Sequence, residues 1–473
     1  MVVGQLEEAV DLVVIGAGPG GYAAALRGAQ LGRKVTLVDR DGANGVGGVC
    51  LRVGCIPSKA LIESADLAQK VRDADRFGIK ASLDRVDMER FQAWKAEVIG
   101  GLTDGVRMLL KSAKVDIIEG TFRFNGTDKG VVTPHEGQAR FLNFKDLVIA
   151  TGSRPVELSD LPFDGKTILD STGALDLDQL PKTLAIVGAG YIGLELGIAF
   201  AKLGVKVAMV EAEDRILPTM DAMLSRPVAK TIKVLGIDLH LNTKATGHSR
   251  GKLTLVNSNG EQKIAAEKVI VAVGRKPNTD DLSLVDARIE TDNHGLIAVA
   301  DDRRVTPHIA AIGDITAGPA LAHKATAEAI VAAEALSGRK TAFTAQVIPA
   351  VVFSDPEIAT VGLTDEQASA EGIEPHTASF PLTASGRAKT LGVRDGYLQI
   401  VADKADDRVI GVHAVGPHAS DLIGEGTLAI EMGATVEDIA LTIHAHPTLG
   451  ELYGEAAHLA MGQPIHMSLR GKR

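Results

Sequence analysis

The sequence of 473 residues is short of cysteine, of aromatic side chains and of long apolar runs. Its two cysteines are far too few for the disulfide scaffold of a small secreted protein, so we expect a reducing compartment and a cytoplasmic location. Aromatic residues make up 3% of the chain and glycine contributes 51 residues, a balance typical of an α/β protein with many tight turns. No apolar run reaches the length that a membrane-spanning helix needs, so no membrane is expected as a partner.

Positive charge is also in deficit. The chain has 50 Lys and Arg against 60 Asp and Glu, a formal net charge of -10 at pH 7. Nucleic acids and anionic membranes are bound through basic surfaces, so nucleic acid is not expected as a partner either. The opening segment MVVGQLEEAVDLVVIGAGPGG lacks the basic region of a signal peptide. The length exceeds what one hydrophobic core usually supports and indicates three or four domains.

Both cysteines lie in one short stretch, GGVCLRVGCIPSKAL, at residues 47–61. A disulfide that closes so short a loop stabilises a fold by only about 2 kcal/mol, roughly half of what a hundred-residue loop gives. Redox chemistry is therefore the preferred interpretation, while two independent buried cysteines and a metal site completed by distant ligands are the alternatives. On a regular helix, Cys50 and Cys55 would have Cα atoms roughly 8–9 Å apart, beyond the limit of about 7 Å for a disulfide. A bridge therefore requires a bend, for which Gly54 and Pro57 are the candidates.

One internal repeat organises the chain. The stretch DLVVIGAGPGGYAAALRGAQLGRKVTLVDR has a later counterpart in TLAIVGAGYIGLELGIAFAKLGVKVAMVEA. Each is typical of a buried strand, a Gly-rich turn, a helix and a second strand that closes on an acid. The glycines are Gly16, Gly18 and Gly21 in the first copy and Gly188, Gly190 and Gly193 in the second, and the acids are Asp39 and Glu211, each 23 positions after its first glycine.

This spacing predicts two dinucleotide-binding βαβ units. The first glycine allows a tight turn, the second lets the backbone approach a pyrophosphate, and the third lets helix and strand pack closely. The helix N-terminus then holds the phosphates, and the acid accepts a hydrogen bond from a ribose hydroxyl. One copy alone is weak evidence and could be only a close-packed βαβ turn, but two copies with the same acid offset are strong evidence.

The repeat predicts an α/β fold with two Rossmann-like dinucleotide-binding domains, and the patterns around it give the expected boundaries. Between the two copies, residues 58–112 show a helical pattern. The strings LVIATGSRP and VIVAVGRKPN each end a strand at a crossover, and strand patterns such as YLQIVAD and VIGVHAVG appear after about residue 347. The predicted domains are 1–150, 151–276, 277–346 and 347–473.

Two dinucleotide sites and a close cysteine pair together imply an electron path. One dinucleotide would be a nicotinamide, which carries hydride, and the other a flavin. The cysteines would exchange electrons with a thiol substrate.

The cysteine segment resembles the redox-active segment of the flavin-dependent pyridine nucleotide-disulfide oxidoreductases, and within this family that of the dihydrolipoamide dehydrogenases. The similarity runs over nearly the whole chain. It implies that residues 1–150 bind FAD and 151–276 bind NAD. It also implies a central domain, 277–346, that completes the FAD site and an α+β C-terminal dimerisation domain, 347–473, that forms the interface of a homodimer. The motifs that carry it follow the family's order: the two Gly-rich turns, the cysteine segment, ATGSRP, AVGRKPNT, IGDITAGPALAHKA and HAHPTLGE.

The resemblance implies a role for each matching residue. Cys55 would lie beside the flavin as a charge-transfer thiolate, and Cys50 would meet the substrate. Lys59 would lie near the flavin, paired with Glu195, although local sequence alone would make it a solvated lysine. The other implied FAD contacts are Gly16, Gly18, Gly21, Asp39, Gly120, Thr151, Gly152, Ser153, Asp314 and Ala322, and the implied NAD contacts are Gly188, Gly190, Gly193, Glu211, Ala245 and Gly274.

The late motif HAHPTLGE supplies a base. His446 matches the family's catalytic histidine and Glu451 the acid that orients it, with His444 as the alternative. The chemistry needs a base, because a thiol of pKa about 8.5 is only a few per cent thiolate at pH 7. A paired imidazole can take the proton. In this family the histidine comes from the opposite subunit, so the dimer would be part of the active site.

The implied activity is oxidation of dihydrolipoyl groups through a Cys50–Cys55 disulfide and FAD to NAD+. The implied partners are the lipoyl domains of an acyltransferase or carrier protein, in a 2-oxo acid dehydrogenase complex or in glycine cleavage. The alternatives are another reductase of the family and an NADH-dependent flavin diaphorase. A surface adhesin or a scaffold has no support in the sequence.

Related reductases are separated by what this chain lacks. Mercuric and large thioredoxin reductases use a further C-terminal cysteine or selenocysteine pair, which a chain with two cysteines does not have. Glutathione-type reductases need basic residues after the second strand to bind NADPH, whereas here the strand ends in MVEAED and no Arg follows Glu211 until Arg215. Three residues depart from the commonest pattern or resemble another branch: Arg52, where Asn is frequent, Asp39 in place of Glu, and Tyr191, which resembles a ring covering the nicotinamide in the glutathione branch.

Overall fold

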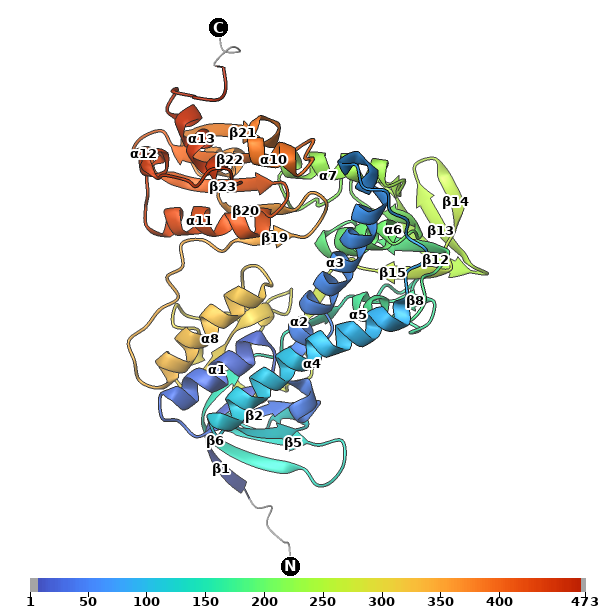
Figure 1. Cartoon of the computed structure of the whole chain (residues 1–473). Helices are drawn as coiled ribbons and strands as arrows, with labels where there is room; N and C mark the ends of the chain where they lie inside the picture. Colours follow the sequence, from blue (N-terminus) through green and yellow to red (C-terminus); the bar gives the residue numbers. More distant parts are fainter. Residues whose placement is uncertain (1–6, 469–473) are drawn as a thin grey trace, which may run out of the picture.

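The computed structural model describes residues 7–468 and builds them around three main sheets (Figure 1). Residues 1–6 and 469–473, which include the start of the segment examined for a signal peptide, lie outside the described part. The predicted α/β fold class is confirmed, since two parallel-strand units carry helices and the last sheet is antiparallel with helices packed on it. Among residues 7–468, no helix has the length and apolar character required to cross a bilayer.

The first sheet has eight strands, with β1 in the middle between β2 and β6. Helices α1 (Pro19–Gln30) and α8 (Ala322–Leu336) lie side by side against this sheet (Figure 1). Its path is β17-β18-β6-β1-β2-β3, and β5 connects the hairpin strand β4 to β6. The strands are β1 (Glu7–Ile15), β2 (Val35–Asp39), β3 (Asp116–Glu119), β4 (Thr121–Phe124), β5 (Lys129–Thr133), β6 (Arg140–Ile149), β17 (Arg304–Thr306) and β18 (Ile309–Ala311).

Strands β17 and β18 come from the range 277–346 but share this sheet and its hydrophobic core. The predicted central segment is therefore continuous with the first nucleotide unit. Where one domain ends and the next begins stays a prediction.

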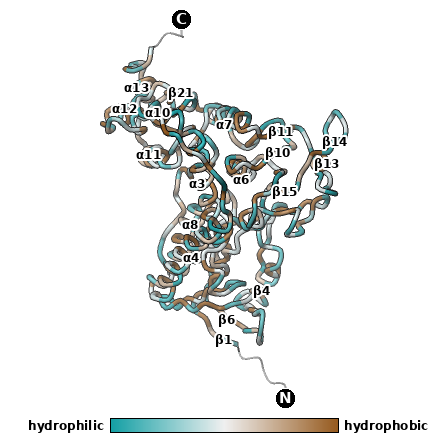
Figure 2. Tube along the Cα trace, turned by 45° about the vertical axis from the view of Figure 1, so that its right-hand side comes forward, coloured by the Kyte–Doolittle hydropathy of each residue, from teal (hydrophilic) through white to brown (hydrophobic). Residues whose placement is uncertain are grey.

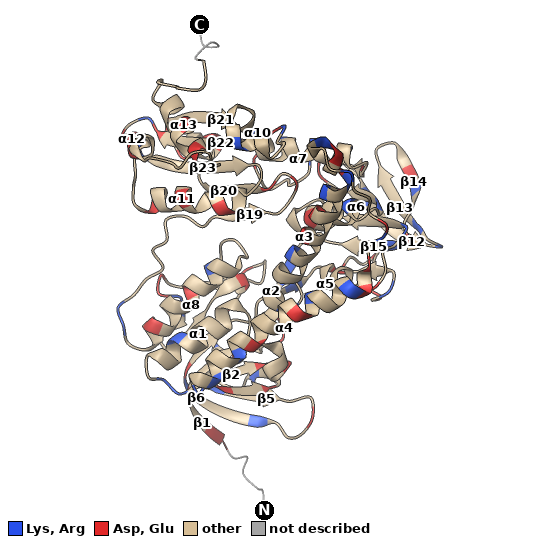
Figure 3. Cartoon of the chain, viewed as in Figure 1, with Lys and Arg blue, Asp and Glu red and all other residues tan. Residues whose placement is uncertain are grey.

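The helical pattern expected over residues 58–112 folds as two long helices. A third, short helix precedes them and carries the first cysteine. Lys, Arg, Asp and Glu are interspersed along α3 and α4 (Figure 3). The elements are η1 (Gly42–Gly45), α2 (Gly48–Arg52), α3 (Cys55–Arg72), η2 (Ala74–Phe77) and α4 (Met88–Ser112).

The second copy of the repeat forms a parallel sheet of five strands in the order β11-β10-β9-β15-β8. A three-stranded antiparallel sheet, β12 to β14, extends from it, and the outer edge of its β13–β14 hairpin is hydrophilic (Figure 2). The strands are β8 (Ile168–Leu169), β9 (Thr183–Val187), β10 (Lys206–Val210), β11 (Asp238–His240), β12 (Lys244–Ser249), β13 (Lys252–Asn257), β14 (Gly260–Ala265) and β15 (Lys268–Val271), and the helices are α5 (Ser171–Leu175), α6 (Tyr191–Lys202) and α7 (Ala222–Val234).

The two crossover strings pair with each other. Strand β7 (Ser153–Pro155) from ATGSRP lies antiparallel to β16 (Arg275–Pro277) from AVGRKPNT. The chain therefore enters and leaves the second nucleotide unit through one two-stranded ribbon. The short helical turns η3 (Leu284–Ala287) and η4 (Gly313–Ile315) follow.

The C-terminal part is an antiparallel sheet in the order β19-β20-β23-β22-β21. The predicted strand patterns YLQIVAD and VIGVHAVG are confirmed as β22 and β23. The strands are β19 (Ala350–Val352), β20 (Ile358–Gly362), β21 (Pro375–Pro381), β22 (Tyr397–Asp403) and β23 (Val409–Val415), and the helices are α9 (Asp365–Ala370), η5 (Leu382–Ala384), α10 (Gly386–Thr390), α11 (Ala419–Glu431), α12 (Val436–Leu441) and α13 (Glu451–Ala460).

Candidate active site

The cysteine segment breaks between two helices, as a close approach of the thiols requires. Helix α2 ends at Arg52 and α3 begins at Cys55. At Gly54 an added Cβ would lie 2.9 Å from the carbonyl oxygen of Val49, so a side chain there would crowd the break. Pro57 lies in the first turn of α3, where its missing N–H costs no intrahelical hydrogen bond. The expected bend thus occurs at Gly54, and Pro57 favours the start of the next helix rather than the bend.

The two cysteines are free thiols that interact with each other. The hydrogen bond from Cys50 to Cys55 is the main cause that raises the pKa of Cys50, and burial raises it further. The same hydrogen bond lowers the pKa of Cys55 to about 7, against burial and with help from the charge of Lys59. Cys55 is therefore the thiolate of the pair and Cys50 the thiol that donates to it.

A cavity of about 770 Å³ lies beside the pair, within the size range of small-molecule and cofactor sites. Both cysteines line it, and so does every predicted FAD contact except Gly21. At Gly21 an added Cβ would lie 1.7 Å from the carbonyl oxygen of Gly16, so this glycine lets α1 pack against the turn. The predicted residues that line the cavity are Gly16, Gly18, Asp39, Lys59, Gly120, Thr151, Gly152, Ser153, Asp314 and Ala322.

The Gly-rich turn forms a cradle of bare backbone that fits an anionic dinucleotide. Gly16 has φ +95, a conformation that favours glycine. An added Cβ at Gly48, the first residue of α2, would lie 2.5 Å from Gly18 Cα. The turn leads into the N-terminus of α1, where backbone N–H groups can bind phosphate. At Gly18, which lines the cavity, an added Cβ would have only Gly48 Cα within 4 Å, so a side chain there would occupy space that a pyrophosphate needs.

The acids that close each repeat also hold the Gly-rich turns. Asp39 Oδ2 accepts the N–H of Ala17 at 2.8 Å. Glu211 Oε2 accepts the N–H of Ala189 at 2.7 Å. The sequence assigned these acids only to a ribose, whereas the structure gives each a second role in shaping its turn. The equal acid offset in the two copies was the signal for it.

The predicted NAD contacts gather at the second sheet and not at the cavity. An added Cβ at Gly193 would lie 2.0 Å from Gly188 O, which repeats the close packing of the first copy. The N–H of Thr243, two residues before Ala245, donates to Glu211 O at 2.9 Å. Gly190 is the N-cap of α6. Gly274 follows β15, and β15 pairs with β9, the strand that leads into the second Gly-rich turn.

Helix α6 connects the second nucleotide turn to the cavity. It begins directly after Gly190, and Tyr191, Ile192 and Glu195 on its first turns line the cavity. A nicotinamide ring bound at this turn would therefore be directed toward the first cofactor. The covering role of Tyr191 stays a prediction.

Lys59 forms an ion pair with a buried acid, Glu195. Its Nζ donates to Glu195 Oε2 at 2.8 Å and lies 4.3 Å from the centre of the Phe353 ring. The other oxygen of Glu195 accepts the N–H of Phe353 at 2.9 Å. The pairing of Lys59 with Glu195 implied by the resemblance is present.

Arg275 is a cavity residue that the sequence analysis missed. Its Nε donates to Ser153 Oγ at 2.8 Å, and Ser153 Oγ donates to Asp314 Oδ2 at 2.5 Å. The chain of contacts links the ribbon of the second unit to an implied FAD contact. The signal lay in the string GRKP, which pairs with GSRP.

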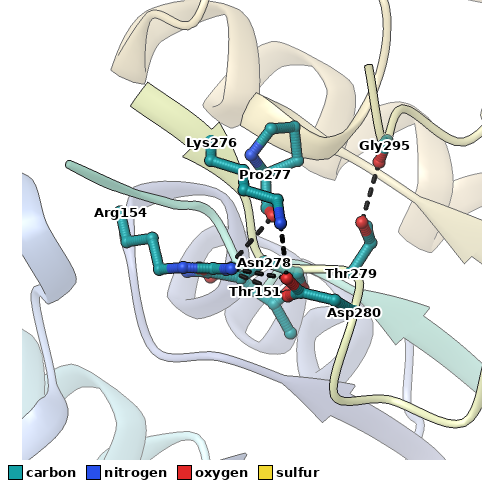
Figure 4. A network of polar contacts seen from close by, with 8 residues as sticks. All are labelled: Thr151, Arg154, Lys276, Pro277, Asn278, Thr279, Asp280 and Gly295. Carbon is teal, nitrogen blue, oxygen red and sulfur yellow. Dashed lines mark hydrogen bonds and ion pairs between the residues drawn. The ribbon is translucent and has the colours of Figure 1, made fainter. Parts of the chain in front are cut away.

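A polar network fixes the ribbon beside the cavity (Figure 4). Thr151 Oγ1 donates to Asn278 O at 2.8 Å, and Asn278 Nδ2 donates back to Thr151 O at 2.9 Å. Arg154 pairs with Asp280, and the hydrogen bond from Arg154 holds the pKa of Asp280 far below its usual range. The N–H of Asn278 donates to Gly152 O at 2.9 Å. Two implied FAD contacts, Thr151 and Gly152, are thus placed by residues after β16.

His446 and Glu451 form a hydrogen-bonded pair. His446 Nδ1 lies 2.8 Å from Glu451 Oε1, and the other oxygen of Glu451 accepts the N–H of Thr448 at 2.9 Å. Burial raises the pKa of Glu451, but these hydrogen bonds outweigh it and lower the pKa overall. The His446 side chain is 79% exposed and does not line the cavity of its own chain. In Figure 1 helix α13, which begins at Glu451, lies well away from α2.

His444, the alternative base, has a largely buried side chain that already contacts Glu425 and Tyr453. Its Nε2 lies 2.8 Å from Glu425 Oε1, and its side chain is only 11% exposed. Its ring stacks on Tyr453 with centroids 6.3 Å apart. The geometry therefore favours His446. Within residues 7–468, no group of three or more His, Cys, Asp or Glu is arranged to hold a metal ion, so metal binding by the cysteines gains no support.

Comparisons with known proteins agree with this geometry. Residues 10–329 match the family model of the pyridine nucleotide-disulphide oxidoreductases. Residues 348–457 match the dimerisation domain of the same family. The chain belongs to the pyridine nucleotide-disulphide oxidoreductases. Its C-terminal part is therefore a dimerisation domain.

Curated relatives and solved structures narrow the resemblance. The dihydrolipoyl dehydrogenase of Geobacillus stearothermophilus is 48% identical over 99% of both chains, and that of Bacillus subtilis (strain 168) is 46% identical over 99% of this chain and 100% of its own. Among solved structures, LpdA from Mycobacterium tuberculosis has a TM-score of 0.88 at 28% identity, covering 95% of this chain and 99% of that one. The HOCl-induced flavoprotein disulfide reductase RclA from Escherichia coli has a TM-score of 0.83 at 26% identity, covering 95% and 99%.

Membership of the pyridine nucleotide-disulphide oxidoreductases makes this chain an oxidoreductase with FAD and NAD as cofactors. The bare-backbone cradle beside the cysteines fits FAD, and the second Gly-rich turn with its acid fits NAD.

Proposed function

We propose that this chain oxidises dihydrolipoyl groups to lipoyl groups and transfers the electrons to NAD+, which is dihydrolipoyl dehydrogenase activity. The observation that carries the proposal is the polarised thiol pair at the cavity wall, with Cys55 as thiolate and Cys50 as thiol. The choice of substrate is supported by the two relatives from Geobacillus stearothermophilus and Bacillus subtilis, which are 48% and 46% identical and are both named dihydrolipoyl dehydrogenase.

The residues of the chain account for the thiol chemistry. His446 takes the proton of one dihydrolipoyl thiol, and the resulting thiolate attacks Cys50 in the oxidised Cys50–Cys55 bridge. That bond breaks and Cys55 leaves as a thiolate, which the charge of Lys59 favours because it lowers the pKa of Cys55. The second substrate thiol then displaces Cys50, releasing the lipoyl disulfide and leaving the cysteine pair reduced by two electrons.

FAD, when bound, supplies a two-electron carrier between the cysteine pair and NAD+. The overall reaction balances, since the dithiol loses two electrons and two protons, NAD+ gains a hydride, and one proton leaves. We assign that proton to His446, whose Nδ1 is held by Glu451 so that the other ring nitrogen remains for the substrate.

The active chain would be a homodimer in which each site borrows His446 from the partner subunit. Two observations support this assignment. His446 does not line the cavity that contains Cys50 and Cys55, and it follows the last strand of the dimerisation domain. The partners in the cell would be the lipoyl domains of an acyltransferase or carrier protein, in the cytoplasm, in a 2-oxo acid dehydrogenase complex or in glycine cleavage. We also propose the FAD and NAD contacts named above as the binding residues.

The proposed activity predicts a preference for NAD+ over NADP+. The buried carboxylate of Glu211, held by the N–H of Ala189 and that of Glu213, would repel a 2′-phosphate. Arg215 donates instead to Pro218 O, so it is turned to its own loop. Because a like-charge contact costs several kcal/mol, kcat/KM with dihydrolipoamide should be at least about 100-fold higher for NAD+.

The measurement is the steady-state reduction of each nucleotide by dihydrolipoamide. Glu211→Gln should lower the ratio of kcat/KM for NAD+ to kcat/KM for NADP+. Lys206→Gln, at the other end of β10, is the control and should leave the ratio unchanged. Equal use of NAD+ and NADP+ would contradict the assignment of Glu211. Failure of dihydrolipoamide to reduce either nucleotide, with NADH oxidation by a dye intact, would overturn the proposed substrate.

A further inference from the structure

Three charged side chains are buried together behind the turn that carries Asp314. The Glu328 side chain is 0% exposed, that of Lys324 is 2% exposed and that of Arg303 is 13% exposed. Lys324 and Glu328 lie one turn apart on α8, and Arg303 directly precedes β17. None of them takes part in the thiol chemistry, and buried charges are costly unless they have partners. We call this set the buried charge cluster.

The buried charge cluster binds the backbone of η4 from behind. Glu328 Oε2 accepts the N–H of Gly313 at 2.7 Å. Lys324 Nζ donates to Gly313 O at 3.0 Å and to Thr316 Oγ1 at 3.1 Å. Both backbone polar groups of Gly313 are thus bonded to charged side chains, which makes the contacts stronger than neutral hydrogen bonds.

The same turn presents Asp314 to the cavity. Gly313 has φ +78, and an added Cβ there would lie 3.3 Å from Ala325 Cβ, so the turn is packed tightly on α8. From the cavity side, Ser153 Oγ donates to Asp314. Asp314 is therefore held in front by Ser153 and from behind, through Gly313, by Lys324 and Glu328.

The charges of the cluster do not cancel. Arg303 Nη1 lies 3.1 Å from Glu328 Oε1, and Lys324 Nζ lies 3.2 Å from the same oxygen, so two cations share one carboxylate. Arg303 Nε is buried without a hydrogen-bond partner, and its guanidinium lies 4.9 Å from the centre of the Phe343 ring. With the carboxylate of Asp314, on the turn that Lys324 and Glu328 bind, the formal charges balance, and Gly313 and Asp314 line the cavity.

We propose that Lys324 and Glu328 are positioning residues for FAD, which fix the Asp314 turn at the wall of the cofactor cavity. The fixed turn would hold Asp314 ready for a cofactor hydroxyl. The inference rests on the assignment of this cavity to FAD and is independent of the thiol substrate.

The test compares FAD affinity among three variants. Lys324→Met removes the hydrogen bonds to Gly313 O and Thr316, and should weaken FAD binding about tenfold or more. Thr316→Val keeps the side-chain shape but removes one hydroxyl of the network, and should weaken binding roughly threefold. Lys202→Met is the matched control, because Lys202 is equally buried and pairs with Asp66 and Asp355, and its side chain does not line the cavity.

FAD is added to flavin-stripped protein, and quenching of flavin fluorescence gives the affinity. Circular dichroism and NAD+ binding report on folding and on the second nucleotide site. A merely structural role would lower thermal stability equally in Lys324→Met and Lys202→Met, whereas we expect only the former to shift the absorption maxima of the bound flavin.

Equal FAD affinity in the two folded lysine variants would overturn the proposal. If the lysine variants do not fold, Thr316→Val decides, since FAD affinity equal to that of the unaltered protein would also overturn it. No thiol substrate is present in these titrations, so a failure of the proposed dihydrolipoyl activity would leave their outcome unaffected.

Discussion

Replacement of Cys50 by serine should abolish reduction of NAD+ by dihydrolipoamide, by a factor on the order of 10⁴ or more. Cys50 is the sulfur that the substrate thiolate must attack, and a serine cannot form the mixed disulfide. The fold should persist, because Cys50 lies on the short helix α2 and is only partly buried. Reduction of an artificial dye by NADH should continue, since neither nucleotide turn is altered.

The two assays on one variant separate the proposed enzyme from a flavin diaphorase. Dihydrolipoamide:NAD+ activity and NADH:dye activity are measured on Cys50→Ser and on Val53→Ala, a matched change in the same segment that leaves both sulfurs. Retention of dihydrolipoamide turnover in Cys50→Ser would show that the sulfur pair is not on the electron path.

Replacement of His446 by glutamine should lower the turnover of dihydrolipoamide by about 10²- to 10⁴-fold, the usual contribution of a general base. Glutamine keeps a polar group beside Glu451 but cannot store a proton. His444→Gln is the matched control two residues away. It should reduce stability, because His444 stacks on Tyr453 and pairs with Glu425, and it should leave turnover within a few-fold. The reverse pattern, with His444→Gln inactive and His446→Gln active, would reassign the base.

Mixed dimers test which subunit supplies His446. Cys50→Ser and His446→Gln chains with different tags are produced together, and the dimer carrying both tags is isolated. If the histidine crosses the interface, one of the two sites in this dimer has both residues intact, so about half of the activity of the unaltered dimer should return. A mixed dimer as inactive as its parents would place His446 and Cys50 in the same chain's site.

The repeated Gly-rich pattern predicted the two parallel units well because local backbone geometry determines where its glycines and closing acid must stand. A tight turn, a close helix and a strand end are set by residues within one βαβ unit. The break at Gly54 was predictable for the same reason, since it follows from the spacing of Cys50 and Cys55. The strands β22 and β23 followed from their runs of apolar and β-branched residues.

Contacts between segments that are distant in the chain could not be predicted from the sequence. The pairing of β7 with β16, and with it the hydrogen bond from Arg275 to Ser153, depends on how the two units are docked. The burial of Lys324 and Glu328 could not be predicted from an Ala-rich helix, where charged residues usually face solvent. Their burial depends on β17, β18 and η4, which pack on α8 only in the complete fold.

The visible spectrum of the protein before and after one equivalent of dihydrolipoamide tests the central claim, that Cys55 receives electrons as a thiolate against the flavin. We expect the yellow protein to gain a long-wavelength absorbance that is strong above the Cys55 pKa of about 7 and weakens as the pH falls below it, because the thiolate becomes protonated. The band should be missing in Cys55→Ser. Flavin bleaching without a long-wavelength band, or a band that survives in Cys55→Ser, would contradict the account.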